Sequence, residues 1–277
     1  YYYELFDIKQ YITNTIEINK NLKNNNLKVA TINSLSGVIP LLSKDLGITS
    51  EYSINMDIKV YQNGQDLIEN FVKDNFDIGI LGVVPAFLWK SSGSDIKIHA
   101  RVNEGGHAIL SRNQINNISD LNNRKIVVPK INESVSDNLL KKITRDLNLN
   151  IKRIDLNELD YELKQLIENF HRLENIDAFL LWEPYVSLML KKYNTLKMLY
   201  NFKEENKKYT SNVVIINKNI SKIHLSLIED IFKETIKKLN NQNRKVLVAL
   251  QNYFEVDGEV IKTSLTNIIY KYEKWEA

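Results

Sequence analysis

Small polar residues and glycines recur in this sequence where predicted strands end and helices begin. Ser34, Ser36 and Gly37 open one predicted helix, and Gly64 and Gln65 open the next. The first backbone N–H groups of a helix have no partner within the helix, so they can bind anions, particularly beside a hydroxyl group. The alternative for each position is an ordinary cap, in which the side chain bonds its own helix. Several such starts together favour a binding site for an anionic group.

Two further helix starts continue the pattern. Pro85 lies in the first turn of the helix after Gly82, where its missing N–H costs no hydrogen bond, and Asn132 and Ser134 precede another helix. In open parallel sheets, ligands bind outside the carboxyl ends of the strands, where such turns lie. Turns need glycine and proline in any case, which is the alternative explanation. Neither a Walker-type phosphate loop nor a GxGxxG pattern occurs, so no nucleotide site is predicted.

Aromatic and charged residues follow two other predicted strands. Trp182 and Glu183 end one strand, beside Tyr185, and could wall an apolar or cationic part of a ligand. Alternatively, Trp182 packs in the core and Glu183 caps its helix. Arg101 could pair with an anion in a bidentate manner, and His107 could donate a hydrogen bond to it. For Arg101 the preferred alternative is a surface position. For His107 the alternative is a place in a hinge turn built on two glycines.

Composition excludes several kinds of chemistry. The chain has no cysteine, which removes disulfides, cysteine-based zinc sites, thiol catalysis and iron–sulfur clusters. No HExxH motif and no GxSxG elbow occurs, so we expect no metal, no cofactor and no catalytic residue. Its 37 basic and 34 acidic side chains nearly balance, without a basic stripe interleaved with aromatics, so we expect no nucleic-acid partner.

The elements that position these residues alternate between strand and helix from residue 27 onward. Such alternation at short spacing predicts parallel βαβ units. We expect strands at 27–31, 57–61, 77–81, 96–102, 107–111, 125–128, 151–156, 177–182, 196–200 and 213–216. We expect helices at 38–46, 65–73, 134–147 and 159–170, after Pro85 and Pro184, and at 222–239, 242–253 and 258–275 near the C-terminus.

The N-terminal part differs from the rest. Residues 1–26 are expected to form a lead-in helix or spacer, amphipathic from about residue 4. The sequence begins with three tyrosines, a residue type that gathers at membrane interfaces, so we expect that a signal anchor preceded it. A frayed aromatic terminus is the alternative. No apolar run approaches the roughly 18 residues that cross a bilayer.

Four segments carry a family resemblance, in the same order and at matching spacing over residues 27–270. They are DIGILGVVPA at 77–86, NEGGHA at 103–108, ISDLNNRKIVVP at 118–129 and IDAFLLWEPY at 176–185. Together they resemble the signatures of the nitrate/sulfonate/taurine type of substrate-binding protein of ABC importers. The cysteine-rich motif of the thiamine-precursor branch is absent, and there is no cluster of basic residues for nitrate.

The resemblance implies an α/β type II periplasmic-binding-protein fold, with two lobes, a two-strand hinge and a ligand cleft between them. Residues 27–110 and 210–277 would form the first lobe and 111–209 the second. By position, the cleft would be lined by Ser34, Ser36, Gly37, Gly64, Gln65, Val84, Pro85, Asn132, Ser134, Trp182 and Glu183.

The implied function is that of an extracytoplasmic receptor. It would bind a small anion or zwitterion, first of all a sulfonate such as taurine, with nitrate and related anions as alternatives, and pass it to a permease and an ATPase. We expect a monomer, periplasmic or at the cell surface and tethered to the membrane in its full-length form. The main alternative is an enzyme on the same fold, such as a menaquinone-pathway lyase or a pyrimidine-precursor synthase; a sensory domain is another.

Overall fold

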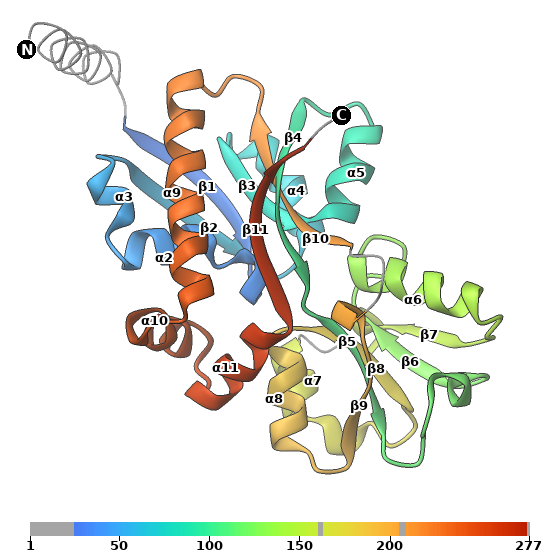
Figure 1. Cartoon of the computed structure of the whole chain (residues 1–277). Coiled ribbons are helices and arrows are strands. Elements are labelled where there is room, and N and C mark those ends of the chain that lie inside the picture. The colour runs from blue at the N-terminus through green and yellow to red at the C-terminus, as the bar shows by residue number, and fades with distance from the viewer. Residues whose placement is uncertain (1–24, 160–162, 205–208, 276–277) are drawn as a thin grey trace, which may run out of the picture.

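The structure, a computed structural model, describes residues 25–159, 163–204 and 209–275 (Figure 1). The lead-in helix that we predicted over 1–26 lies almost entirely outside the described residues. Two separate sheets organise the chain, and each one has helices packed against both of its faces. We call each sheet with its helices a lobe.

The first lobe contains a six-stranded sheet in the order β11-β4-β10-β3-β1-β2. Its strands are β1 (Asn26–Ile32), β2 (Asn55–Tyr61), β3 (Ile78–Gly82), β4 (Ile96–Gly105), β10 (Thr210–Asn217) and β11 (Ile268–Lys274). β1 runs parallel to β2 and β3, whereas β10 is antiparallel to both of its neighbours. The central strand β3 is buried along its whole length, as a strand covered on both faces must be.

The second lobe contains a five-stranded sheet in the order β7-β6-β8-β5-β9. Its strands are β5 (His107–Arg112), β6 (Lys125–Val128), β7 (Lys152–Asp155), β8 (Ala178–Trp182) and β9 (Leu196–Asn201). β6 is parallel to β7 and β8, as the alternating pattern predicted, and β5 is antiparallel to β8 and β9.

Apolar side chains on the helices fill the space on both faces of each sheet. In the first lobe the helices are η1 (Leu35–Gly37), α2 (Ile39–Asp45), α3 (Ile48–Glu51), α4 (Gly64–Lys73), α5 (Val83–Ser91), α9 (Lys222–Asn241), α10 (Arg244–Phe254) and α11 (Gly258–Thr266). In the second they are η2 (Ile118–Leu121), α6 (Val135–Asp146), η3 (Leu156–Leu159), α7 (Leu163–Glu168), η4 (Phe170–Arg172), α8 (Tyr185–Lys192) and η5 (Phe202–Glu204).

The chain crosses between the lobes twice. It passes from β4 into β5 through Gly105 and Gly106, whose φ angles of +76° and +82° favour glycine. A Cβ atom on Gly105 would lie 2.6 Å from the carbonyl oxygen of Asn267, so no larger residue fits there. The chain returns from β9 into β10. The predicted α/β fold with two lobes joined by two strands is confirmed.

One predicted element at the C-terminus is wrong. We expected a single helix over 258–275, but α11 ends at Thr266 and β11 pairs antiparallel with β4 (Figure 1). Ile268 and Tyr270 are buried while Ile269 and Lys271 between and after them are half-buried, which is the two-residue period of a strand. The backbone of residues 268–274 forms its hydrogen bonds with the edge of β4 and not within a helix. The local sequence does not reveal that this edge is available.

Asn267, between α11 and β11, bonds both crossing strands. Its backbone carbonyl accepts from the N–H of Gly106 at 2.8 Å, and its Oδ1 accepts from Nδ2 of Asn201 at 3.1 Å. Its Nδ2 donates to Oε1 of Glu183 at 2.6 Å. The C-terminal segment therefore belongs to the first lobe but holds the second lobe at the base of the crossing.

Tyr270 provides a test of β11. Its hydroxyl, on a side chain with 5% exposure, donates to the carbonyl of Leu35 at 2.8 Å. We expect Tyr270→Phe to lower the free energy of unfolding by about 1–2 kcal/mol, because the carbonyl then loses its partner in a buried place. Urea unfolding followed by circular dichroism measures this.

Tyr272→Phe is the matched control for this experiment. The Tyr272 hydroxyl is also buried but has no hydrogen-bond partner within the described residues, so its removal should cost little. Equal losses for the two variants would contradict the assigned role of the Tyr270 hydroxyl.

Candidate functional site

A cavity lies between the lobes, where strands of both sheets end. On the first lobe it is lined by Ile32, Asn33, Ser34, Ser36, Gln62, Asn63, Gly64, Gln65, Gly82, Pro85 and Asn212. On the second lobe it is lined by His107, Pro129, Lys130, Glu133, Ser134, Val135, Ser136 and Trp182. Parallel strands present their carboxyl ends at one edge, and that edge of each sheet faces the other lobe.

The structure brings most of the predicted site residues together in this cavity. They are Ser34, Ser36, Gly64, Gln65, Pro85, His107, Ser134 and Trp182. Three cavity-facing helix starts are capped by side chains. Ser34 Oγ accepts from the Gly37 N–H at 3.2 Å, Ser134 Oγ accepts from the Asp137 N–H at 3.1 Å, and Asn63 Oδ1 accepts from the Asp66 N–H at 2.9 Å. Ser34, Ser134 and Asn63 therefore cap their own helices, which was the alternative to an anion site.

Three predicted site residues do not line the cavity. Gly37 is buried where a Cβ atom would lie 2.2 Å from the carbonyl oxygen of Ile32, so its role is close packing. Val84 packs against the core of the second lobe. Asn132 is exposed, and its Oδ1 accepts from Nζ of Lys141 at 2.6 Å.

The other two predicted residues do not line the cavity either. Arg101 lies on β4, where its Nε is 3.8 Å from Oε2 of Glu273 and its guanidinium covers the ring of Trp275 at 5.3 Å. Glu183 is buried and accepts from Ser187 and from Asn267, so its carboxylate joins the lobes and does not line the cavity. Burial raises the pKa of Glu183, and the hydrogen bonds that it accepts oppose this shift.

Three buried polar atoms on cavity-lining residues have no hydrogen-bond partner among the described residues. They are the hydroxyl of Ser136, Nε1 of Trp182 and Nδ2 of Asn212. The Ser136 residue is 1% exposed and Asn212 is 3% exposed, so water does not solvate them freely. A buried donor without a partner costs roughly 1–3 kcal/mol. Each of the three can donate a hydrogen bond.

Sequence reasoning missed Ser136 and Asn212. Ser136 follows the Ser134 cap by two residues, so a search of the first helical turn for further hydroxyl groups would have found it. Asn212 lies on β10, and only the antiparallel register that pairs it with Gly82 brings it to the cavity. No local sequence signal indicates that pairing.

His107 is the titratable ring in the cavity wall. Its Nδ1 lies 3.1 Å from the hydroxyl of Tyr209. Burial lowers the pKa of His107 to about 4, against a smaller opposing effect of the Gly105 carbonyl. The ring is therefore neutral at pH 7.

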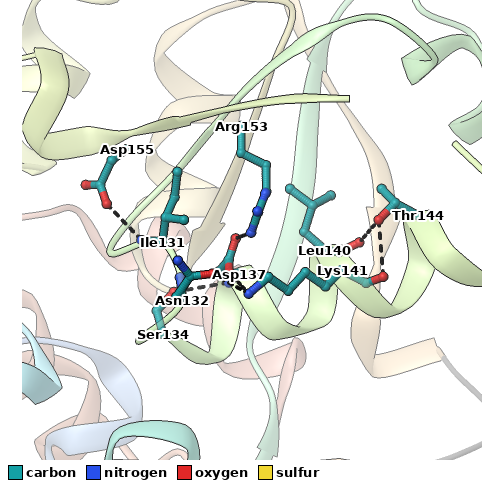
Figure 2. Close-up of polar contacts among 9 residues, drawn as sticks. All are labelled: Ile131, Asn132, Ser134, Asp137, Leu140, Lys141, Thr144, Arg153 and Asp155. Carbon is teal, nitrogen blue, oxygen red and sulfur yellow. Dashed lines mark hydrogen bonds and ion pairs between the residues drawn. The ribbon is translucent and has the colours of Figure 1, made fainter. Parts of the chain in front are cut away.

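A buried carboxylate holds the loop that begins α6 (Figure 2). Asp137 Oδ1 lies 2.6 Å from a guanidinium nitrogen of Arg153, and Oδ2 lies 2.9 Å from Nζ of Lys141. Oδ2 also accepts from the N–H of Asn132 at 2.9 Å. Burial alone would raise the pKa of Asp137, but Lys141, the Asn132 N–H and Arg153 together lower it.

The same loop needs this support because of its backbone. Lys130 and Asn132 have φ angles of +52° and +68°, which are unfavourable for residues other than glycine. The N–H of Ile131 between them donates to Oδ2 of Asp155 at 2.8 Å. Asp137 and Asp155 thus fix the part of the cavity wall that contains Lys130, Glu133 and Ser134.

Comparison with known proteins gives no match by sequence. No protein-family model matches the chain, and no curated protein matches it.

Within the described residues no group of three or more histidine, aspartate or glutamate side chains could hold a metal ion. Nor does any helix in that part of the chain combine the length and hydrophobicity that a membrane span requires.

Solved structures do resemble the chain. The periplasmic aliphatic sulphonate binding protein SsuA from Escherichia coli has a TM-score of 0.75 at 18% identity, over 90% of this chain and 82% of its own. The alkanesulfonate-binding protein SsuA from Xanthomonas axonopodis pv. citri, bound to MOPS, has a TM-score of 0.76 at 15% identity, over 90% and 86%.

A third similar structure is the ligand-binding component of an ABC-type import system from Staphylococcus aureus, with zinc bound. Its TM-score is 0.71 at 16% identity, over 89% of this chain and 85% of its own. At such identities the likeness establishes the fold, which is the predicted type II periplasmic-binding-protein fold.

The Asp137 cluster supports a stability prediction. We expect Asp137→Asn to lower the free energy of unfolding by about 3 kcal/mol, because two cations then face a buried neutral amide. Asp146→Asn, at a half-exposed ion pair with Lys142 on the same helix, should cost below about 1 kcal/mol. Urea unfolding compares them, and equal costs would contradict the role assigned to Asp137.

The burial of His107 predicts a dependence of stability on pH. The pKa is about 4 in the folded chain and 6.5 in the unfolded chain, so between these values the unfolded state binds more protons. The free energy of unfolding should therefore fall as the pH falls from 6.5 to 4, by up to roughly 3 kcal/mol from this residue.

His107→Asn should remove that component, and the same change at the exposed His171 should not. Urea unfolding at pH 7 and at pH 4.5 measures the difference for each variant. An unchanged pH dependence in His107→Asn would show that the ring titrates normally in the folded state.

Proposed function

We propose that this chain is the extracytoplasmic solute receptor of an ABC importer and that it captures a small organic anion or zwitterion between its two lobes. The observation that carries the proposal is that Ser136, Trp182 and Asn212 line one cavity and that each has a buried donor without a partner among the described residues. A protein interior rarely leaves such groups unpaired, so their presence on residues of one cavity supports a ligand there.

The chemistry of the donors supports a ligand with an oxyanion group. A sulfonate group carries one negative charge and has three acceptor oxygens, one for each of the three donors. Apolar residues of the cavity, among them Ile32, Pro85 and Val135, suit the carbon part of an organic solute. Sulfonates are therefore the first candidates, with taurine-like compounds among them, and two proteins of similar fold are named for binding sulfonates.

The distribution of the donors supports capture by lobe closure. Ser136 and Trp182 belong to the second lobe and Asn212 to the first. A ligand that bonds all three binds better when the lobes are together, and this difference in affinity would drive closure about the strands at Gly105 and Gly106. In this proposal the closed receptor delivers its solute to a permease and an ATPase as a monomer, tethered outside the membrane.

An enzyme on the same fold is the rival. A fold alone does not decide between receptor and enzyme, because function depends on the residues in the site. The similar structures described above are named as binding proteins or, in one case, as the ligand-binding component of an import system. Recovery of the bound compound unchanged after long incubation, measured by mass spectrometry, would favour a receptor, and conversion of the compound would favour an enzyme.

Calorimetry with a panel of alkanesulfonates, taurine, nitrate and bicarbonate tests the proposal. We expect micromolar or tighter binding of at least one sulfonate, and about a tenfold weaker affinity in Ser136→Ala, because a hydrogen bond to a charged group is lost. Ser136→Ala should leave stability almost unchanged, since the hydroxyl has no partner among the residues that the structure describes.

Ser111→Ala is the matched control, because the Ser111 hydroxyl on β5 is also buried without a partner among the described residues and does not line the cavity. It should leave the affinity unchanged. Absence of binding across the whole panel would refute the proposal, and so would equal weakening by the two variants.

A further inference from the structure

Lys130 lines the cavity between the lobes and also lines a second cavity beside it, whose lining includes residues of α7 and Tyr185. Because the two cavities share Lys130 and Trp182 among their lining residues, Lys130 lies where they meet. Among the described residues that line either cavity, Lys130 is the one that carries a positive charge at pH 7, since burial keeps His107 neutral. Any charge attraction that the lining offers to an anion therefore comes from Lys130.

The ammonium group of Lys130 has no partner of its own in the described part of the chain. It forms no ion pair within 4.0 Å and donates no hydrogen bond there. The carboxylates of Glu133 and Asp66 line the first and the second cavity, yet neither lies within 4.0 Å of this ammonium group. An ammonium group has three N–H donors, so Lys130 can offer all of them to a solute.

The backbone conformation at Lys130 is unfavourable for a lysine. Its φ of +52° lies in the left-handed region, which glycine, asparagine and aspartate adopt more readily than other residues. Four other described non-glycine residues with positive φ are asparagines, and Gln242 and Glu255 end helices. Lys130 belongs to neither group. Strain of this kind is typical of ligand sites, where the surrounding structure holds a residue in place for its side chain.

The second lobe holds the strained loop in position. The N–H groups of Glu133 and Ser134 donate to the Lys130 carbonyl at 3.2 and 3.1 Å. The carboxylates of Asp155 and Asp137 accept from the N–H groups of the two residues that follow Lys130. Four hydrogen bonds thus fix the backbone from which the Lys130 side chain extends.

We infer that Lys130 supplies the positive charge that meets the anionic group of the bound solute. This inference rests on the proposed function and adds a residue that determines its selectivity. The buried donors of Ser136, Trp182 and Asn212 are neutral and can orient acceptor oxygens whether or not these carry a charge. A charged donor strengthens a hydrogen bond to a charged acceptor, so Lys130 distinguishes an anion from a neutral molecule of the same shape.

A cycle between ligand and protein tests this assignment. The probes are an alkane-1-sulfonate and the neutral alkane-1-sulfonamide with the same carbon chain, and isothermal calorimetry measures both dissociation constants. Lys130→Met should weaken binding of the sulfonate by about tenfold or more, because a hydrogen bond between charged groups is lost. It should change binding of the sulfonamide by roughly twofold or less. If the wild type binds nitrate or bicarbonate instead, the same loss of about tenfold is expected for that anion.

Stability separates a role in binding from a role in folding. Lys130→Asn introduces a residue that adopts positive φ more readily, so its urea midpoint should equal or exceed that of the wild type. The same variant should bind the anion about tenfold more weakly, because the charge is lost. Lys130→Arg keeps the charge on a different side chain and should bind within about threefold of the wild type.

Lys152→Met is the matched control. Lys152 is an exposed lysine on β7 of the same lobe, and it lines neither cavity. Its replacement should leave both dissociation constants unchanged. An effect equal to that of Lys130→Met would overturn the inference, because the net charge of the lobe would then account for the attraction.

The outcomes distinguish this inference from the proposed function. If the wild type binds an anion of the panel and Lys130→Met binds it equally well, the receptor proposal stands and the assignment of Lys130 is overturned. Equal weakening for the sulfonate and the sulfonamide, or a lower urea midpoint in Lys130→Asn, would also overturn it, since the side chain would then be structural. Absence of binding by the wild type across the panel would overturn both.

Discussion

The hydrogen bonds of Asn267 are the constraint on which the arrangement of the two lobes depends. One residue at the end of α11 bonds the crossing strand at Gly106, the end of β9 at Asn201 and the turn after β8 at Glu183. The backbone of Glu183 adds bonds to Gly106 and to Leu35 of the first lobe. Breaking these contacts would leave buried polar groups without partners, so the base of the cleft is well defined. The cavity walls above it face each other for this reason.

Within the cavity, shaping and binding are divided between different residues. Ser34, Asn63 and Ser134 cap the helices that surround the space, and Asp137 and Asp155 hold a loop with two positive φ angles. These residues have partners in the protein. Ser136, Trp182 and Asn212 instead present buried polar atoms that have none among the described residues. The distinction indicates which side chains build the site and which are available to a solute.

The likeness to solute-binding proteins and the chemistry of the cavity lead to the same proposal by independent routes. Fold similarity at 15–18% identity concerns the path of the chain and leaves the ligand open. The neutral donors and the neutral His107 are features of this chain itself. Together they favour a solute that carries acceptor oxygens.

The sequence by itself determined the alternation of strands and helices, because apolar runs bounded by glycine and proline are local signals. It also placed Ser36, Pro85 and Trp182 at strand ends, and its four motifs indicated the correct fold. Tertiary structure decided what depends on distant partners: residues 268–274 became a strand because the edge of β4 was open, and Asn212 reached the cavity through its pairing with Gly82. It likewise turned Glu183 toward Asn267 and left Arg101 beside Trp275, because burial and ion pairing are properties of the packed chain.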